Sequence, residues 1–411
     1  MRRALLFMII AVFFLTAIVE AAGVQATAPE QGSKVLVTTK VVEALGKIGN
    51  PQASTVLKEA LKSKEFFIRA YAAQALGRIR DKQSIPLLKN LTSDSNYLVR
   101  ILSAVALLEL GEKEAGDLIL SFLKDENSAA RSAIADEAQG LGPKFLFALT
   151  AMLPAEKEYL VRANMIEGLG NAGFNPALSY ILQAMEDKHE YVRRAACSAI
   201  GKIRAKEGIP RLLQSLGDSN ATVRAAAIIA LGRLQERSKI DVFRKGINAE
   251  EPELAAASCL ALALLGELDI LPVLLEKITS AESQTIIRTQ VAKALSMLRP
   301  RIVKSAKKAL RQGTDRQVLA LLDNIEFDYQ VNGKNLTLIF TSALRDAQSP
   351  LYPDAPLVLK GLGAKLALPA LREALLQDDP DLVATAAYVL GEFQDKDAFD
   401  YLIKIFEKYG I

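Results

Sequence analysis

The sequence predicts an all-α fold, an α-solenoid of about a dozen helix-turn-helix repeats of about 31 residues each. Ala and Leu dominate a chain that is 50% apolar and only 6% aromatic, with no Trp, which is typical of helices. Arginines recur at a constant period, as at positions 162, 193 and 224, and glycines follow several of them at a fixed distance. Both series lie in segments whose apolar residues have helical spacing, so each period is one helical unit.

Residues 1–26 have the pattern of an export signal. Arg2 and Arg3 precede an uncharged run over 4–19, and small residues suited to cleavage follow at Ala21, Gly23 and Ala26. The uncharged run is shorter than the roughly 20 residues of a spanning helix. We therefore expect a signal peptide over 1–26 and a short linker over 27–35, with an uncleaved membrane anchor as the alternative. Both interpretations place the protein outside the cytoplasm, in a periplasm or the extracellular space.

The repeat is defined by two columns of opposite charge. The arginine column has one member in each period and comprises Arg69, Arg100, Arg131, Arg162, Arg193 and Arg224. The acidic column lies six positions before these arginines and comprises Asp94, Asp125, Glu156, Asp187 and Asp218. This spacing favours a structural ladder, in which each arginine is engaged by a carboxylate inside the stack, over a free cationic strip. Exposed pairs of this kind contribute only about 0–1 kcal/mol, so the ladder would serve register more than stability.

Each unit contains two helices. Apolar residues follow the arginine at the spacing of one helical face, as in Ala196, Cys197, Ile200 and Ile203. A second run carries a proline near its start, where the missing N–H costs nothing: Pro86, Pro210, Pro272 and Pro369. We call these the arginine helix and the proline helix. Neither can bury its apolar stripe alone, so stacking of the units supplies the core.

A glycine column runs through the arginine helices. It comprises Gly77, Gly170, Gly201 and Gly232, and its phase extends back to Gly46. Glycine inside a helix costs about 1 kcal/mol relative to alanine, so its return at a fixed phase needs an offsetting gain. We expect a neighbouring helix to approach closely at each of these glycines.

The repeats are regular over 36–299, although Ala255 occupies the arginine column and Arg288 comes two positions late. Residues 300–356 are irregular and contain an insertion. Residues 357–411 return to the repeat pattern, and their last helix is expected to form a cap.

Within the irregular part, Asn-Gly in residues 330–336 is a hairpin signal in a strand context. In a helical chain a long turn between helices is the favoured interpretation, with a small β-excursion as the alternative. Residues 335–346 resemble the first helix of a further unit, whose acidic column would begin at Asp346.

These features resemble a known family. The order Asp, apolar-Arg, Ala-x-Ala-Leu-Gly-x-Ile and Ile-Pro-x-Leu, repeated once in each period, is similar to the phycobilisome-lyase-type HEAT repeat of bacteria. The resemblance covers about 36–299 well and 335–411 more weakly. It implies a right-handed superhelix whose second helices line the concave side, with the two charged columns in contact between adjacent units. It implies no single function, because such solenoids serve many tasks.

The sequence offers no catalytic, metal or cofactor site. His189 is the single histidine and falls in a loop position, which removes most zinc and iron sites. Cys197 and Cys259 are two periods apart, too far for a disulfide, and occupy a core column. No phosphate-binding or nucleophile motif lies in a strand-to-helix setting. The net charge of +4 gives no field of the kind that draws a protein to nucleic acid.

Two surface patches are candidate binding sites. Taking the arginine helix as the second helix of the family's unit, its fifth and ninth positions after the arginine should face the concave surface, and there Ile229, Leu260 and Leu264 form an apolar patch beside Arg233 and Lys202. Tighter local packing is the alternative. The second patch could meet an anionic partner or lipid headgroups, although a solvated outer face is favoured: it comprises Arg301, Lys304, Lys308 and Arg311.

The sequence thus favours an exported, monomeric scaffold that binds a protein or peptide partner and catalyses nothing. An accessory protein of the phycobilin lyase or chaperone type is one alternative, which the export signal disfavours because those reactions are cytoplasmic. A membrane-tethered assembly factor of the cell envelope is the other.

Overall fold

The computed structural model describes residues 29–310, 328–332 and 334–409. The expected signal peptide lies outside these residues. The chain forms two compact units: unit 1 comprises the described residues of Met1–Glu137 and Lys365–Ile411, and unit 2 comprises those of Ala138–Ala364. Within the described ranges, no helix combines the length and the apolarity needed to cross a bilayer.

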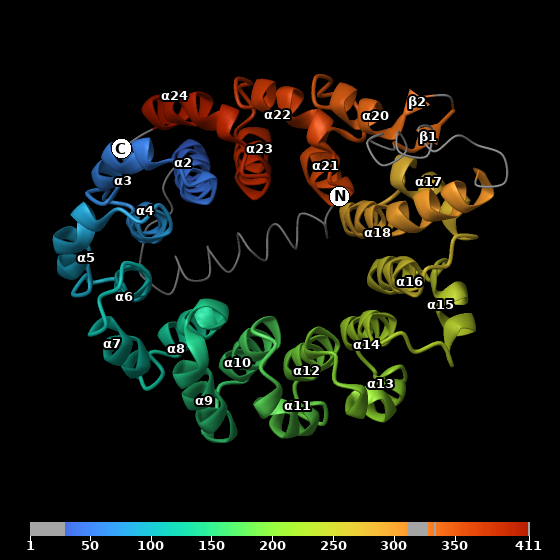
Figure 1. Ribbon diagram of the computed structural model, residues 1–411, viewed down its shortest axis with the longest axis horizontal. Coiled ribbons are helices and arrows are strands. Elements are labelled where there is room, and N and C mark those ends of the chain that lie inside the picture. The colour runs from blue at the N-terminus through green and yellow to red at the C-terminus, as the bar shows by residue number, and fades with distance from the viewer. Residues whose placement is uncertain (1–28, 311–327, 333, 410–411) are drawn as a thin grey trace. The chain divides into compact units, whose positions relative to one another are not determined.

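Unit 2 consists of two layers of helices (Figure 1). Helices of the first layer pack on one another in chain order: α10 (Tyr159–Asn171), α12 (Glu190–Ile203), α14 (Ala221–Arg233), α16 (Pro252–Leu265), α18 (Thr285–Leu310) and α21 (Ala355–Leu362). These are the arginine helices and their continuation. The second layer contains the proline helices and their counterparts: α9 (Gly142–Met152), α11 (Leu178–Ala184), α13 (Ile209–Ser215), α15 (Ile240–Gly246), α17 (Leu271–Thr279) and α20 (Leu336–Ala343).

Unit 1 has the same two layers. Its first layer contains α2 (Pro29–Ile48), α4 (Phe66–Arg78), α6 (Tyr97–Glu109), α8 (Ser128–Asp136) and α23 (Pro380–Glu392), and its second layer contains α3 (Ser54–Ala60), α5 (Ile85–Leu91), α7 (Ala115–Phe122), α22 (Leu368–Ala374) and α24 (Phe399–Tyr409). Helix α2 packs against α4 on one side and against α23 on the other, and α24 also contacts α2. The first and last repeats of the chain therefore stack on each other.

Short 3-10 helices lie in the turns, most of them leading into a second-layer helix. They are η1 (Pro51–Ala53), η2 (Lys82–Ser84), η3 (Glu137–Gly140), η4 (Leu153–Ala155), η5 (Asn175–Ala177), η6 (Lys206–Gly208), η7 (Tyr352–Asp354), η8 (Lys365–Ala367) and η9 (Lys396–Ala398). Several arginine helices begin at an asparagine N-cap: the side chain of Asn220, for example, accepts a hydrogen bond from the backbone N–H of Thr222.

The glycine column lies where adjacent helices touch, which confirms the prediction of close approach. A Cβ added at Gly201 would lie 2.8 Å from the Cα of Ala230 in the next arginine helix, and one at Gly170 would lie 2.7 Å from the Cα of Ala199. Gly391 of α23 meets Ala44 of α2 in the same way, at 2.8 Å. The terminal repeats thus use the contact that joins consecutive repeats elsewhere.

The structure corrects three expectations about irregular segments. The expected linker over 27–35 is helical from Pro29 onward. Helix α18 continues through Pro300 to Leu310, beyond the predicted end of the regular part at 299. Residues 330–336 do not form the favoured interhelical turn: β1 (Gln330–Val331) pairs antiparallel with β2 (Lys334–Asn335), which is the β-excursion that Asn-Gly signals.

A fourth correction concerns residues 335–346, which we expected to resemble the first helix of a repeat: α20 lies in the second layer and packs on α21, as the proline helices pack on the arginine helix that follows them. Asp346 comes after α20 and accepts a hydrogen bond from the N–H of Gln348, as the acids of the column do in their turns. The partner of Arg288 is Asp354, at a sequence separation of 66 instead of the usual 25. Both side chains of this ion pair are about 95% buried. Helix α21 packs on α18 after the insertion, and Asp354, next to the start of α21, supplies the acid for Arg288.

Candidate functional site

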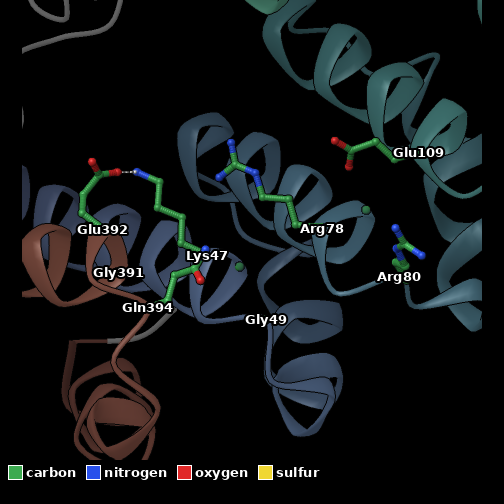
Figure 2. A pocket seen from close by; sticks show the side chains of 10 residues that line it. Lys47, Gly49, Arg78, Arg80, Glu109, Gly391, Glu392 and Gln394 are labelled. Carbon is green, nitrogen blue, oxygen red and sulfur yellow. Dashed lines mark ion pairs between the residues drawn. The ribbon is translucent and has the colours of Figure 1, made fainter. Parts of the chain in front are cut away.

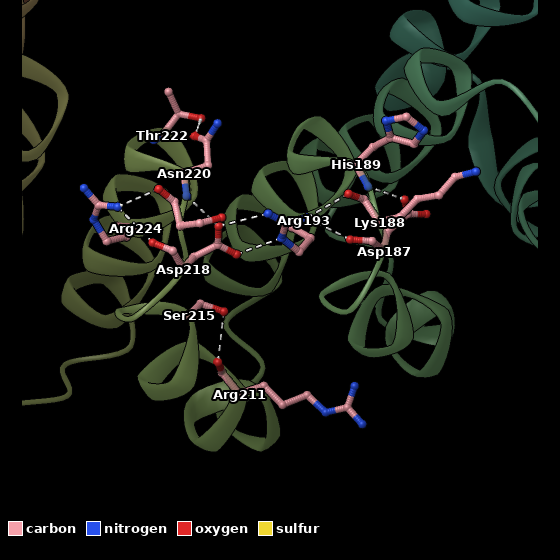
Figure 3. A network of polar contacts seen from close by, with 11 residues as sticks. Asp187, Lys188, His189, Arg193, Arg211, Ser215, Asp218, Asn220, Thr222 and Arg224 are labelled. Atoms are coloured by element: carbon pink, nitrogen blue, oxygen red, sulfur yellow. Dashed lines mark hydrogen bonds and ion pairs between the residues drawn. The ribbon is translucent and has the colours of Figure 1, made fainter.

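The arginine and acidic columns form contacts between adjacent repeats (Figure 3). Arg193 donates from Nε and Nη2 to the two carboxylate oxygens of Asp218, at 2.7 and 2.9 Å, and from Nη1 to the backbone carbonyls of Asp187 and Lys188. Arg69 with Asp94 and Arg162 with Asp187 repeat this bidentate geometry, at 3.0–3.1 Å. All three nitrogens of these guanidinium groups are engaged inside the stack, which makes them poor candidates for binding a ligand.

The remaining members of the column vary. Arg100 lies 3.9 Å from Asp125, and Arg224 bonds Glu251 at 3.1 Å. Arg131 donates to the carbonyls of its own loop, Asp125 and Glu126, and Glu156 accepts from the N–H of Glu158. The hydrogen bond from Arg193 holds the pKa of Asp218 below its ordinary value, which favours the charged form that the ladder needs.

The expected apolar patch is only partly open. Ile229 and Leu264 are half-buried, whereas Leu260 is 5% exposed and belongs to the core. Lys202 donates to the Glu167 carboxylate and to the Asn171 side chain, each at 2.6 Å. Leu260 and Lys202 are therefore packed or engaged and offer a partner little, which corrects their assignment as binding residues.

Arg233 differs from the ladder arginines. Its guanidinium makes no ion pair or side-chain hydrogen bond within the described part of the chain. Burial lowers the pKa of Arg233, while the charge of Glu167 acts in the opposite direction. Glu167 is already bonded to Lys202, so Arg233 lacks a carboxylate of its own.

Sequence reasoning missed two residues of the same face, Lys293 and Met297 of α18. Met297 is 44% exposed. One period after Leu260 falls at position 291, but the two-position delay of Arg288 moves the column to Lys293, and Met297 likewise follows Leu264. The late position of Arg288 is therefore the sequence signal that places Lys293 and Met297 on this face. Burial, followed by the charges of Lys360 and Arg233, lowers the pKa of Lys293.

The expected anionic-partner patch is described only in part. Arg301 donates to the carbonyl of Leu265 at 3.2 Å, so its guanidinium is used within the stack. Lys304 is exposed. Lys308 lies in α18, but its side chain is outside the described atoms, and Arg311 lies outside the described residues.

Unit 1 has a pocket of about 590 Å³ at the C-terminal ends of α2, α4, α6 and α23 (Figure 2). Lys47 forms an ion pair with Glu392 at 2.8 Å across the α2–α23 contact. Arg78, Arg80 and Glu109 line the other side, and burial raises the pKa of Glu109 although both arginines oppose this. Three cations and two carboxylates line the pocket, so its charge is mixed and does not indicate a class of ligand. Its existence depends on α23 meeting α2, which the repeat pattern does not indicate.

The described residues contain no cluster of His, Cys, Asp and Glu that could hold a metal ion. Cys197 and Cys259 are free and buried, as expected for core residues, and burial raises the pKa of each thiol to about 11. His189 precedes α12 and stacks on the ring of Tyr159, with 4.2 Å between the centroids.

Comparison with known proteins identifies the family. The family model of HEAT repeats matches residues 67–139, 146–232 and 209–296, and that of the PBS lyase HEAT-like repeat matches residues 39–63. The chain belongs to the HEAT-repeat proteins. No curated protein matches it in sequence.

Similar solved structures share low sequence identity with the chain. The YibA protein of Escherichia coli is 22% identical over 64% of this chain and 97% of its own, with a TM-score of 0.40. The complex of CpcE and CpcF of phycocyanin lyase from Nostoc is 19% identical over 66% of this chain and 92% of its own, with a TM-score of 0.33. An engineered protein is 15% identical over 88% and 99%, with a TM-score of 0.34.

Proposed function

We propose that this chain is an exported, monomeric HEAT-repeat scaffold that binds a protein or peptide partner on the arginine-helix layer of unit 2 and catalyses no reaction. One observation carries the proposal: Ile229 and Leu264 leave aliphatic surface open beside Arg233, whose guanidinium has no carboxylate of its own in the described structure. Aliphatic surface next to an unengaged arginine is typical of the centre of an interface, where arginine is enriched.

Pull-down of partners from the native cell-envelope fraction, analysed by mass spectrometry, tests this function. We expect the Ile229→Asp, Leu264→Asp double variant to lose the partner, because it places carboxylates in the apolar part of the surface. Val242→Asp is the matched control, since Val242 is a 46% exposed aliphatic residue in α15, in the opposite layer of the same repeats. A partner that is retained by the double variant would refute the proposed surface.

Export is supported by the sequence of residues 1–26 alone. The N-terminal sequence of the protein isolated from its native cells tests it. Cleavage predicts a mature chain that begins between positions 22 and 27, in the periplasm or medium. A membrane-bound chain that retains Arg2 would instead indicate an anchor, and a cytoplasmic chain that retains Arg2 would refute export.

A further inference from the structure

Three adjacent helices of unit 2 present one continuous surface, which we call the α14–α16–α18 face. It points away from α13, α15 and α17, which pack on the other side of these helices (Figure 1). Each helix has two residues one turn apart at these positions: Ile229 and Arg233, Leu260 and Leu264, Lys293 and Met297. Five of the six reach the surface, because Leu260 is buried. The constant period and the two-position delay align them as two rows of three. The central helix is aliphatic, and a cation stands on each side of it.

The two cations of this face are uncompensated. Neither Arg233 nor Lys293 forms an ion pair or a side-chain hydrogen bond within the described residues, unlike the ladder arginines. Burial lowers the pKa of Lys293 most, followed by the charge of Lys360 of α21 and then by that of Arg233 on the other side of α16. The acid whose charge reaches Arg233 is Glu167, which Lys202 already engages.

Like charges on one face repel each other, and an anion bound near Arg233 and Lys293 would relieve this repulsion. A carboxylate also accepts strong hydrogen bonds from guanidinium and ammonium groups. Aliphatic groups lie beside the cations, since Met297 is 44% exposed and Ile229 and Leu264 are half-buried. A ligand that contacts both the cations and the aliphatic side chains of this face would therefore need carboxylate groups next to aliphatic groups.

We propose that the α14–α16–α18 face binds a partner protein through a segment in which acidic side chains, placed between Arg233 and Lys293, flank aliphatic side chains that pack on Ile229, Leu264 and Met297. This inference rests on the proposed partner-binding function and specifies the chemistry of the partner. The N-terminal segment of this chain and a second copy of the chain could also cover this face, but their charges complement its two cations less well. The apolar N-terminal segment of this chain begins with Arg2 and Arg3 and contains one acid, Glu20. A second copy of the same face would bring its own cations.

Selection of short random peptides on the full mature chain tests the inference. We expect the selected peptides to be enriched in Asp or Glu next to Leu, Ile or Val. The Arg233→Gln, Lys293→Gln double variant should weaken the best peptide by roughly a hundredfold or more, because each lost charge-assisted hydrogen bond contributes roughly tenfold or more to the affinity. Arg233→Lys should retain most of the affinity, and added salt should reduce it. Fluorescence anisotropy measures these affinities.

The matched control is the Lys239→Gln, Lys245→Gln double variant, which removes the same charge from exposed positions at and beside α15. It should leave the affinity unchanged, and an equal loss would reveal a nonspecific charge effect and overturn the inference. Binding that needs Ile229 and Leu264 but ignores the two cations would overturn it and leave the proposed function standing. Selected peptides whose affinity depends neither on Ile229 and Leu264 nor on the two cations would count against the inference and against the proposed binding surface.

The alternative occupants give distinct results, and each would overturn the inference. A synthetic peptide of the 1–26 segment that competes with the selected peptides, and binds equally to the Arg233→Gln, Lys293→Gln variant, would assign the face to the chain's own leader. A dimer in analytical ultracentrifugation that Ile229→Asp dissociates would assign it to a second copy. Cation-dependent binding of anionic lipid vesicles, without any acidic enrichment of peptides, would assign it to lipid headgroups.

Discussion

The glycine contacts between arginine helices give the most direct test of how the repeats stack. In Gly201→Ala, the new Cβ would lie 2.8 Å from Cα and 2.9 Å from Cβ of Ala230. One of the two obstructing atoms is backbone, so rotation of a side chain cannot relieve the contact and the helices must separate. Overpacking of this kind costs about 1–3 kcal/mol. Alanine regains about 1 kcal/mol of helix propensity, so we expect a net loss of up to about 2 kcal/mol.

Gly116→Ala is the matched control, because Gly116 lies in α7 and an added Cβ would have no atom within 4 Å. We expect this variant to gain up to about 1 kcal/mol, from helix propensity and a more restricted unfolded chain. Urea unfolding followed by far-ultraviolet circular dichroism measures both, with the first transition compared if the repeats unfold in stages. If Gly201→Ala stabilised the protein as much as Gly116→Ala, close approach would not be the reason for the glycine column.

Three further predictions concern the buried and ionised groups. Arg288→Met should destabilise unit 2 by about 3–5 kcal/mol, because it leaves Asp354 buried without its counter-charge; Arg288→Met with Asp354→Leu should recover most of the loss in urea unfolding. The pKa of Asp218 is lower in the folded state than its ordinary 3.8, so its contribution to stability is present above pH 3.8 and disappears as the pH falls through the folded value; acid titrations of the free energy of unfolding should show a weaker dependence in Asp218→Asn. The Cys197 and Cys259 thiols, with pKa values of about 11 and no exposed surface, should not react with a thiol reagent at neutral pH until urea unfolds the chain.

The regular part of the fold could be predicted from the sequence because every unit repeats the same local chemistry. A glycine that returns at one phase, as Gly201 and Gly232 do, needs a common cause, and the neighbouring helix supplies it. The phase of Cys197 likewise predicts a core position, and its side chain is buried. Because the period is constant, the structure of a weakly patterned repeat can be predicted from the well-patterned repeats beside it.

Contacts between distant segments could not be predicted in this way. The period indicates that a unit has neighbours, but it does not say that α23 lies beside α2, because both faces look like any other repeat face. The replacement of a local acid by Asp354 depends on how the insertion returns to the stack, which no local pattern encodes.

The proposed α14–α16–α18 face contains residues that the period predicts and residues that it does not. Ile229, Leu264 and Arg233 follow from the period, whereas Lys293 requires that the column be moved by the two-position delay of Arg288. The engagement of Lys202 by Glu167 depends on side-chain geometry that spacing alone does not define. Sequence patterns therefore indicate a candidate surface, and the side-chain contacts show which of its charges are engaged within the described structure.

The stacking of α23 on α2 changes how the chain ends are expected to open. In a linear array of repeats the terminal unit has one neighbour, so its amides exchange with solvent first. Helix α2 has a neighbour on each side, and Thr38 donates a hydrogen bond to the carbonyl of Tyr409 in α24. The first and last repeats should therefore exchange as slowly as interior ones, and removal of either should expose the other to fraying.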